Sequence, residues 1–168
     1  MASFLASHGT REDVAKHVRD ARLEAGIGPD DDVLGALVSW MEQDKKVTPL
    51  KALQGLVWED GYLSGTLKGH IYEDAVEGLQ KWHQQGLKLF VYSSGSIHAQ
   101  KLLFGNSEAG DLTSLFSGYF DTTSGHKREQ ASYESIAASM GIQPGAILFL
   151  SDVAEELYAA SAAGYQTI

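Results

Sequence analysis

Three groups of polar residues follow three apolar, strand-like runs of the sequence, and together they could bind a phosphate and a metal ion. The first group is Ser93-Ser94-Gly95-Ser96, which comes directly after the run Leu87–Tyr92 and just before a segment of helical periodicity. Hydroxyl groups and free backbone N–H groups at the start of a helix suit an anion such as phosphate. Serine and glycine also suit turns and helix caps, with Ser96 as the cap, and that simpler interpretation stays open.

The second and third groups supply opposite charges. Lys127 follows the short run Gly118–Asp121 and could give a cation to the same phosphate, although a lone lysine is usually a solvated surface residue. Asp152 follows the apolar run 146–151 (AILFLS), and Glu156 comes four residues later. Carboxylates there suit Mg²⁺, which prefers a few carboxylates together with waters and substrate oxygens. The same acids would also suit the first turn of a helix, with Asp152 as its cap.

A parallel sheet would bring these three groups together. From Leu67 onward, apolar runs alternate with helical segments, and the runs are nearly continuous rather than alternating in polarity. This pattern predicts an α/β fold with a doubly wound parallel sheet that is covered on both faces. Ligands of such sheets bind beyond the carboxyl ends of the strands. The conjunction of hydroxyls, a lysine and carboxylates at successive strand ends therefore predicts a site for Mg²⁺-assisted phosphoryl transfer.

The part of the chain before this pattern is different in character. Residues 11–66 carry helical signals throughout, with Gly26 suited to end one helix and Thr48-Pro49 suited to begin another, Thr48 being its cap. We therefore predict two domains, a helical lobe over residues 1–66 and an α/β core over residues 67–168. The three tryptophans of the chain are predicted to be core aromatics. They are Trp40 and Trp58 in the helical lobe and Trp82 in the α/β core.

Composition narrows the possible partners. The chain has 168 residues and a net charge of −9, which argues against sequence-independent binding to nucleic acid. It has no cysteine, which excludes disulfides, thiol catalysis and thiolate metal sites and is compatible with a cytoplasmic location. No apolar run approaches the roughly 18 residues of a membrane span, and the N-terminus is too short and polar for a signal peptide.

The order of hydroxyls, lysine and acidic pair resembles three motifs of the haloacid dehalogenase-like phosphatases. Longer strings are more specific and resemble the enolase-phosphatase (acireductone synthase) family of methionine salvage: TPLKALQG, LKGHIY, VYSSGSIHAQKLLFG, GDLTSLFSGYFDTTSGHK and ILFLSDV. The resemblance runs over nearly the whole chain and is best over residues 48–168.

This resemblance implies a concrete chemistry. The family enolises 2,3-diketo-5-methylthiopentyl-1-phosphate and then removes its phosphate, uses Mg²⁺, and is typically a cytoplasmic monomer. Residues 1–66 would form an all-helical cap lobe over the phosphatase core. Carried over by position, Ser93 and Ser94 would bind the substrate phosphate and Lys127 would pair with it. Asp152 would hold the metal, with Glu156 as a second acidic position.

The sequence also departs from the family pattern. Members of the family begin with a strand that ends in Asp-x-Glu-Gly-Thr, whose first aspartate attacks phosphorus; Gly9-Thr10 follows no such strand. That strand lies in the sheet between the strands ending at Ser93 and Ser151, so we expect two unpaired strand edges. We therefore expect a chain truncated at both ends that is inactive alone and whose edges could pair between chains.

Two alternatives follow from that departure. The chain could be a non-catalytic binding module derived from the same fold, because such a module needs no attacking aspartate. It could also be another haloacid dehalogenase-like phosphatase that acts on a different small phosphoester, which a panel of substrates would distinguish.

Overall fold

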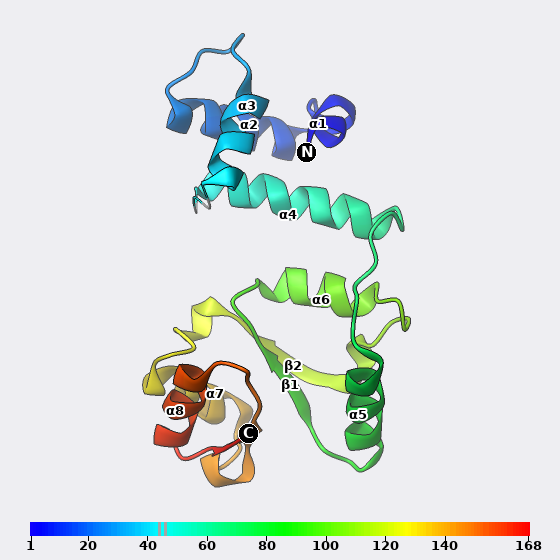
Figure 1. Cartoon of the computed structure of the whole chain (residues 1–168), viewed down its shortest axis with the longest axis vertical. Helices are drawn as coiled ribbons and strands as arrows, with labels where there is room; N and C mark the ends of the chain where they lie inside the picture. Colours follow the sequence, from blue (N-terminus) through cyan, green and yellow to red (C-terminus); the bar gives the residue numbers. More distant parts are fainter. Residues whose placement is uncertain (44, 46) are drawn as a thin grey trace. The chain divides into compact units, whose positions relative to one another are not determined.

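The computed structural model describes residues 1–43, 45 and 47–168, which divide into two compact units, Met1–Lys68 and Gly69–Ile168 (Figure 1). The described residues of the first unit form helices without any strand, and the second unit holds all the described strands. The roles of cap lobe and phosphatase core for these two parts remain predictions.

The first unit is a small helical bundle around one apolar core. Helix α2 (Glu12–Ala25) packs against α3 (Val33–Glu42) and α4 (Thr48–Leu63), and a short helix α1 (Ala2–His8) precedes them. The buried core is contributed by all four helices: Phe4, Val14, Ala21, Val33, Leu37, Trp40, Leu50 and Leu53.

Local chemistry sets several of these helix ends. Gly26 adopts the left-handed conformation (φ 66°) that ends α2, as predicted. The Asp32 side chain caps α3 by accepting a hydrogen bond from the Leu34 N–H. The prediction that Thr48 caps α4 is wrong by one residue, because the helix begins at Thr48 and its cap position is Val47. Of the three tryptophans predicted to be core residues, Trp40 is buried, but Trp58 (50% exposed) and Trp82 (36% exposed) are not.

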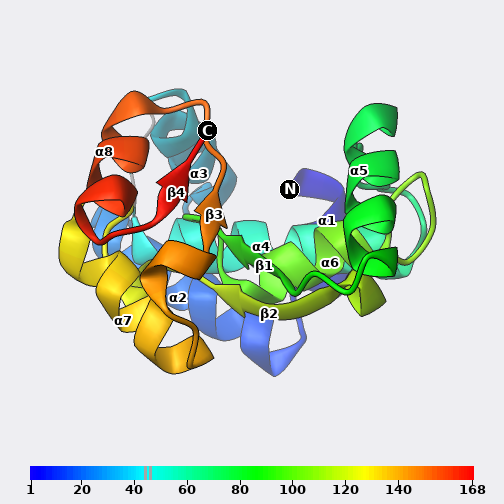
Figure 2. The ribbon, with the colours of Figure 1, turned by 90° about the horizontal axis from the view of Figure 1, so that it is seen from below.

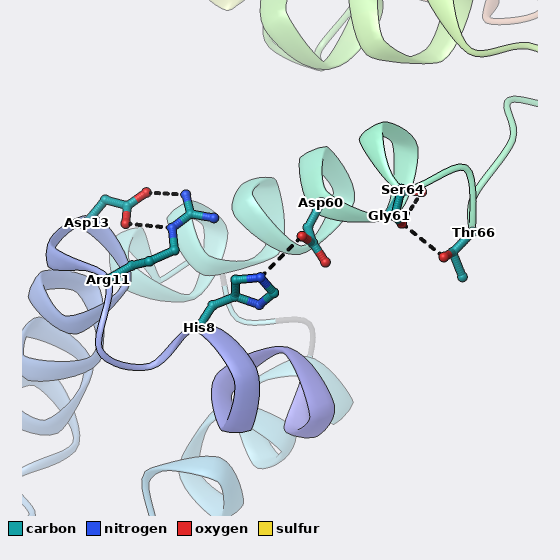
Figure 3. A network of polar contacts seen from close by, with 7 residues as sticks. All are labelled: His8, Arg11, Asp13, Asp60, Gly61, Ser64 and Thr66. Carbon is teal, nitrogen blue, oxygen red and sulfur yellow. Dashed lines mark hydrogen bonds and ion pairs between the residues drawn. The ribbon is translucent and has the colours of Figure 1, made fainter.

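A polar contact between His8 and Asp60 connects the short α1 to α4 (Figure 3). Helix α1 has no side-chain cap. The His8 Nε2 lies 3.5 Å from Asp60 Oδ1 on α4, and the His8 ring stacks on Phe4 with ring centroids 4.8 Å apart. Nearby, the Arg11 guanidinium donates two hydrogen bonds to Asp13, of 2.7 and 3.2 Å. Of these contacts, the His8–Asp60 pair is the one that joins α1 to the end of α4.

The second unit alternates helices and strands in the predicted order. Its helices and strands are α5 (Glu73–Gln84), β1 (Leu89–Tyr92), α6 (Ile97–Gly105), β2 (Phe116–Phe120), α7 (Gln130–Met140), β3 (Leu148–Phe149), α8 (Ala154–Ala162) and β4 (Gln166–Thr167). Three short 3₁₀ turns occur among the described residues, at Thr113–Leu115, Thr122–Ser124 and Pro144–Ala146. Helix α5 packs against β1 and α6 against β2, while α8 packs against α7 and β4 (Figure 2).

All the described strands pair in parallel, which confirms the predicted α/β class. β1 pairs with β2, with Tyr92 opposite Phe120, and β3 pairs with β4, with Leu148 opposite Gln166. These are two separate two-stranded sheets. As predicted, no described residue forms a strand that joins β1 to β3.

An aromatic cluster links the two small sheets through side chains. Tyr133 of α7 is 1% exposed, and its ring lies 5.6 Å from Tyr92 of β1 and 5.1 Å from Phe149 of β3, centroid to centroid. Tyr165 lies 5.6 Å from the same ring and donates a 2.8 Å hydrogen bond to the Tyr133 carbonyl. Packing around Tyr133 therefore takes the place of a backbone ladder between β1 and β3.

Candidate active site

The predicted site residues follow the carboxyl ends of β1, β2 and β3. The Ser93 N–H donates to the Phe120 carbonyl (3.1 Å), which carries the β1–β2 pairing one step beyond Tyr92. In the other sheet, the Ser151 N–H donates to the Ile168 carbonyl (3.2 Å). Three segments thus follow strand ends, where an α/β fold binds ligands. They are the serine loop (residues 93–96) after β1, the lysine loop (residues 125–127) after β2 and the acidic segment (residues 151–156) after β3.

The serine loop, residues 93–96, is held by its own side chains and by a buried glutamine. Ser96 caps α6 by accepting from the Ala99 N–H (3.2 Å), so the capping interpretation is correct for this residue. The Gln100 side chain donates to the carbonyls of Gly95 (2.8 Å) and Phe120 (2.9 Å). The exposed Ser94 makes no hydrogen bond with another described residue, so its hydroxyl is available to a ligand.

Asp121 is a structural position beside the candidate site that sequence reasoning missed. It is 8% exposed, and its Oδ2 accepts from the Ile97 N–H at the start of α6 (3.1 Å). Its Oδ1 accepts from the Thr123 N–H (2.9 Å) and from the Thr123 hydroxyl (2.6 Å). These hydrogen bonds, those from Thr123 first, hold the pKa of the Asp121 carboxyl below its usual value. The carboxylate thereby fixes the serine-loop helix to the end of β2.

Asp121→Asn should lower the free energy of unfolding at neutral pH by about 1–3 kcal/mol, because the amide nitrogen would face the Ile97 N–H donor. The folded-state pKa is lowered, so the carboxylate's contribution is complete above the unfolded aspartate pKa of about 4 and is lost as the pH falls through the folded value. Urea denaturation at several pH values measures both effects.

Asp111→Asn is the matched control for this experiment. Asp111 accepts from the Thr113 N–H (2.8 Å) and hydroxyl (2.6 Å) in the same way, but it is exposed and makes no hydrogen bond to α6. The loss of unfolding free energy should be larger for Asp121→Asn than for Asp111→Asn by the contribution of the Ile97 hydrogen bond. Equal losses would contradict the role assigned to Asp121.

Lys127 and Glu156 come from two of the predicted groups, and the structure brings them together. Lys127 Nζ lies 2.5 Å from Glu156 Oε2, and the two side chains are 21% and 11% exposed. The Ser151 hydroxyl donates to the same Glu156 oxygen (2.8 Å), and the lysine ammonium lies 5.9 Å from the centroid of the Tyr92 ring. Lys127 is therefore a paired, largely buried cation rather than a solvated surface lysine.

Asp152 is the carboxylate that stays free at this edge. It is exposed and makes no hydrogen bond or ion pair within the described part of the chain. It does not cap α8, because that helix begins at Ala154 and Val153 holds the cap position. The Val153 N–H donates a hydrogen bond to the Ser151 hydroxyl oxygen (3.1 Å). Over residues 1–43, 45 and 47–168, no three histidine or acidic side chains gather into a metal site.

The haloacid dehalogenase-like hydrolase family model matches residues 5–164, so the chain belongs to this family of hydrolases. Several relatives within the family are enolase-phosphatases. The chain is 57% identical to "Enolase-phosphatase E1" of Pseudomonas fluorescens over 99% of this chain and 74% of that protein. The corresponding protein of Methylococcus capsulatus is 52% identical, with the same two coverages.

Two solved structures resemble this chain in fold. The crystal structure of the UTR4 protein of Saccharomyces cerevisiae is 33% identical with a TM-score of 0.84, and the match covers 99% of this chain and 76% of that one. A predicted phosphoglycolate phosphatase from Haemophilus somnus shares the fold alone, with a TM-score of 0.55 at 22% identity over 92% of this chain and 76% of that one.

Proposed function

We propose that this chain serves as the phosphate-binding part of a cytoplasmic, monomeric enolase-phosphatase of methionine salvage. Its substrate would be a small phosphorylated diketone, 2,3-diketo-5-methylthiopentyl-1-phosphate, which is enolised and then dephosphorylated. The observation that carries the proposal is that a partly buried lysine, a free hydroxyl and a free carboxylate follow three parallel strand ends: Lys127, Ser94 and Asp152. No helix in the described ranges is long and apolar enough to cross a membrane.

The phosphate would be held mainly by charge and by hydroxyl donors. Lys127 would pair with a phosphate oxygen, while Ser93 and Ser94 would donate hydrogen bonds to others. Because Glu156 already lies against the ammonium, a bound phosphate would share Lys127 with it. A phosphoryl group in transfer carries negative charge spread over its oxygens, so fixed donors and a fixed cation stabilise the transition state.

The free Asp152 carboxylate fits Mg²⁺, which usually binds one or two carboxylates and completes its octahedron with waters and substrate oxygens. Asp152 would hold the ion directly. Glu156 would act as a second acidic position, although one of its oxygens already accepts from Ser151 and Lys127. When bound, Mg²⁺ supplies positive charge against the phosphoryl oxygens.

Titrating the labelled chain with inorganic phosphate and Mg²⁺ tests this assignment by NMR. Phosphate should shift the Lys127 side-chain signals, and Mg²⁺ should shift those of Asp152. Asp152→Asn should remove the response to Mg²⁺ while the phosphate response of Lys127 remains, whereas Asp111→Asn, which changes an exposed acid elsewhere, should leave both. A folded sample in which neither Lys127 nor Asp152 responds would refute the proposed site.

A binding module without turnover is the second candidate, and the state of the carboxylates favours it for these 168 residues. Asp121 accepts three hydrogen bonds, and Glu156 is paired with Lys127. Of these three acids at the site, only Asp152 is free, and that residue is the proposed metal ligand. A carboxylate available to attack phosphorus would then have to come from another segment.

A further inference from the structure

We propose that three hydroxyl side chains outside the predicted site, Tyr92, Ser132 and Tyr133, are positioning residues for Lys127. We call them the hydroxyl clamp. Their task is to fix the backbone of the lysine loop, residues 125–127, so that the ammonium group stands at one place in the phosphate site. This inference rests on the proposed function, because it explains how that function's principal cation is held.

The clamp bonds three consecutive carbonyl groups, one hydroxyl to each. The Tyr92 hydroxyl donates to the Gly125 carbonyl (2.9 Å), and the Ser132 hydroxyl donates to the His126 carbonyl (2.8 Å). The Tyr133 hydroxyl donates to the carbonyl of Lys127 itself (2.6 Å). Each carbonyl of the lysine loop is therefore fixed by a donor from a regular element, β1 in one case and α7 in two.

The clamp is rigid because its members are packed. Tyr133 is 1% exposed, Ser132 is 3% exposed, and the Tyr133 ring contacts Tyr92, Phe149 and Tyr165. Burial raises the pKa of the Tyr92 and Tyr133 hydroxyls, so both are protonated and able to donate at neutral pH.

The backbone conformation at Gly125 also leaves space for the Ser132 side chain of the clamp. Gly125 has φ 115°, a conformation that other residues rarely adopt. A Cβ atom at this position would lie 2.1 Å from the Ser132 hydroxyl oxygen, so only glycine leaves room for that side chain. The glycine, the serine and the two tyrosines thus form one arrangement around the lysine loop.

Positioning matters for this lysine because it has a competing partner. Glu156 lies against the ammonium. If the loop were free to shift, the lysine would stay paired with Glu156 instead of binding the phosphate. A clamped backbone limits the ammonium to side-chain rotation about a fixed Cα. The clamp is expected to strengthen phosphate binding without touching the phosphate.

Tyr133→Phe tests the inference, with Tyr165→Phe as the matched control. Tyr165 is also a buried tyrosine whose hydroxyl donates to a carbonyl (2.8 Å), but its acceptor is the α7 backbone at Tyr133 and not the lysine loop. Tyr133→Phe should weaken the binding of inorganic phosphate by about 3- to 10-fold, the factor that corresponds to one net hydrogen bond. It should also shift and broaden the Lys127 side-chain NMR signals without phosphate, and Tyr165→Phe should do neither.

The outcomes separate this inference from the proposed function. If the wild-type chain binds phosphate and the two variants behave alike in both readouts, the hydroxyl clamp is refuted and the proposed site stands. If the wild-type chain does not bind phosphate but Tyr133→Phe, unlike Tyr165→Phe, disturbs Lys127, the clamp stands and the proposed function fails. Tyr92→Phe and Ser132→Ala should disturb the Lys127 signals in the same way. If only Tyr133→Phe disturbs them, and it does so because the variant no longer folds, the result also counts against the clamp.

Discussion

The 168-residue chain should bind phosphate yet show no measurable phosphoester turnover, and a supplied strand ending in Asp-x-Glu-Gly-Thr should restore turnover. The rate gain is expected to be on the order of 10⁶-fold, the scale of the loss when an attacking nucleophile is removed from another enzyme class. The physical reason lies in the carboxylates at the strand ends. Asp121 and Glu156 are engaged in hydrogen bonds and an ion pair, and Asp152 is proposed for the metal.

The two separate sheets give such a strand a place to pair. β1 and β3 are not hydrogen-bonded to each other, and the exposed Leu148 and Leu150, in and beside β3, are 47% and 51% accessible. A strand that joins both edges would satisfy their backbone groups and cover these side chains. The measurement is phosphate release by the chain alone and by the chain with the segment fused ahead of Met1.

The matched control is the same segment with its first aspartate changed to asparagine. This control should stabilise the fold as much as the original segment does, but it should give no turnover. Robust turnover by the chain alone, abolished by Asp152→Asn, would instead identify Asp152 as the nucleophile and overturn the assignment of that residue to the metal.

Lys127→Met should lower the free energy of unfolding by about 3–5 kcal/mol, because it leaves the Glu156 carboxylate buried without its cation. The same change should remove phosphate binding. Adding Glu156→Gln to this variant should recover most of the lost stability, since the amide oxygen can still accept from Ser151 and carries no charge. Phosphate binding should not return with it. Urea denaturation and a phosphate titration of each variant provide the two measurements.

Lys101 offers a control with similar local geometry. Its ammonium lies 5.7 Å from the centroid of the Tyr119 ring, much as that of Lys127 lies 5.9 Å from Tyr92, but Lys101 is exposed. Lys101→Met should therefore cost about 1 kcal/mol or less, the scale of an exposed cation–π contact. A similar cost for both lysines would show that the Glu156 pair contributes little.

The features that could be predicted from the sequence are those set by neighbouring residues. Gly26 and Gly141 end helices in the left-handed conformation, and Ser96 caps α6, because each depends on a few adjacent positions. The order of helices and strands and the parallel α/β class follow from the alternation of apolar runs and helical segments. The length of a strand is harder to predict from the sequence, since the apolar run 146–151 forms only the two-residue β3 (Leu148–Phe149). Its extent depends on the partner available to it.

The arrangement around the lysine loop could not be predicted because its partners are distant in sequence. Tyr92 and Gly125 are 33 positions apart, and Ile97 and Asp121 are 24 apart. The presence of a tyrosine or aspartate beside an apolar run does not predict which carbonyl or N–H group its side chain will hydrogen-bond. The Lys127–Glu156 pair was likewise expected only as two separate charges, since the sequence does not show which acid the lysine will reach.

The aromatic cluster at Tyr133 has a geometric consequence. A hydrogen-bonded ladder fixes the spacing between neighbouring strands at about 4.8 Å, whereas packed aromatic rings set a spacing through their own size and angle. Tyr92, Tyr133 and Phe149 meet at edge-to-face angles of 81° and 75°, so ring packing and not a backbone hydrogen bond separates the two small sheets. The Tyr133 ring therefore determines how far the β1–β2 pair lies from the β3–β4 pair, while each pair keeps its own backbone hydrogen bonds.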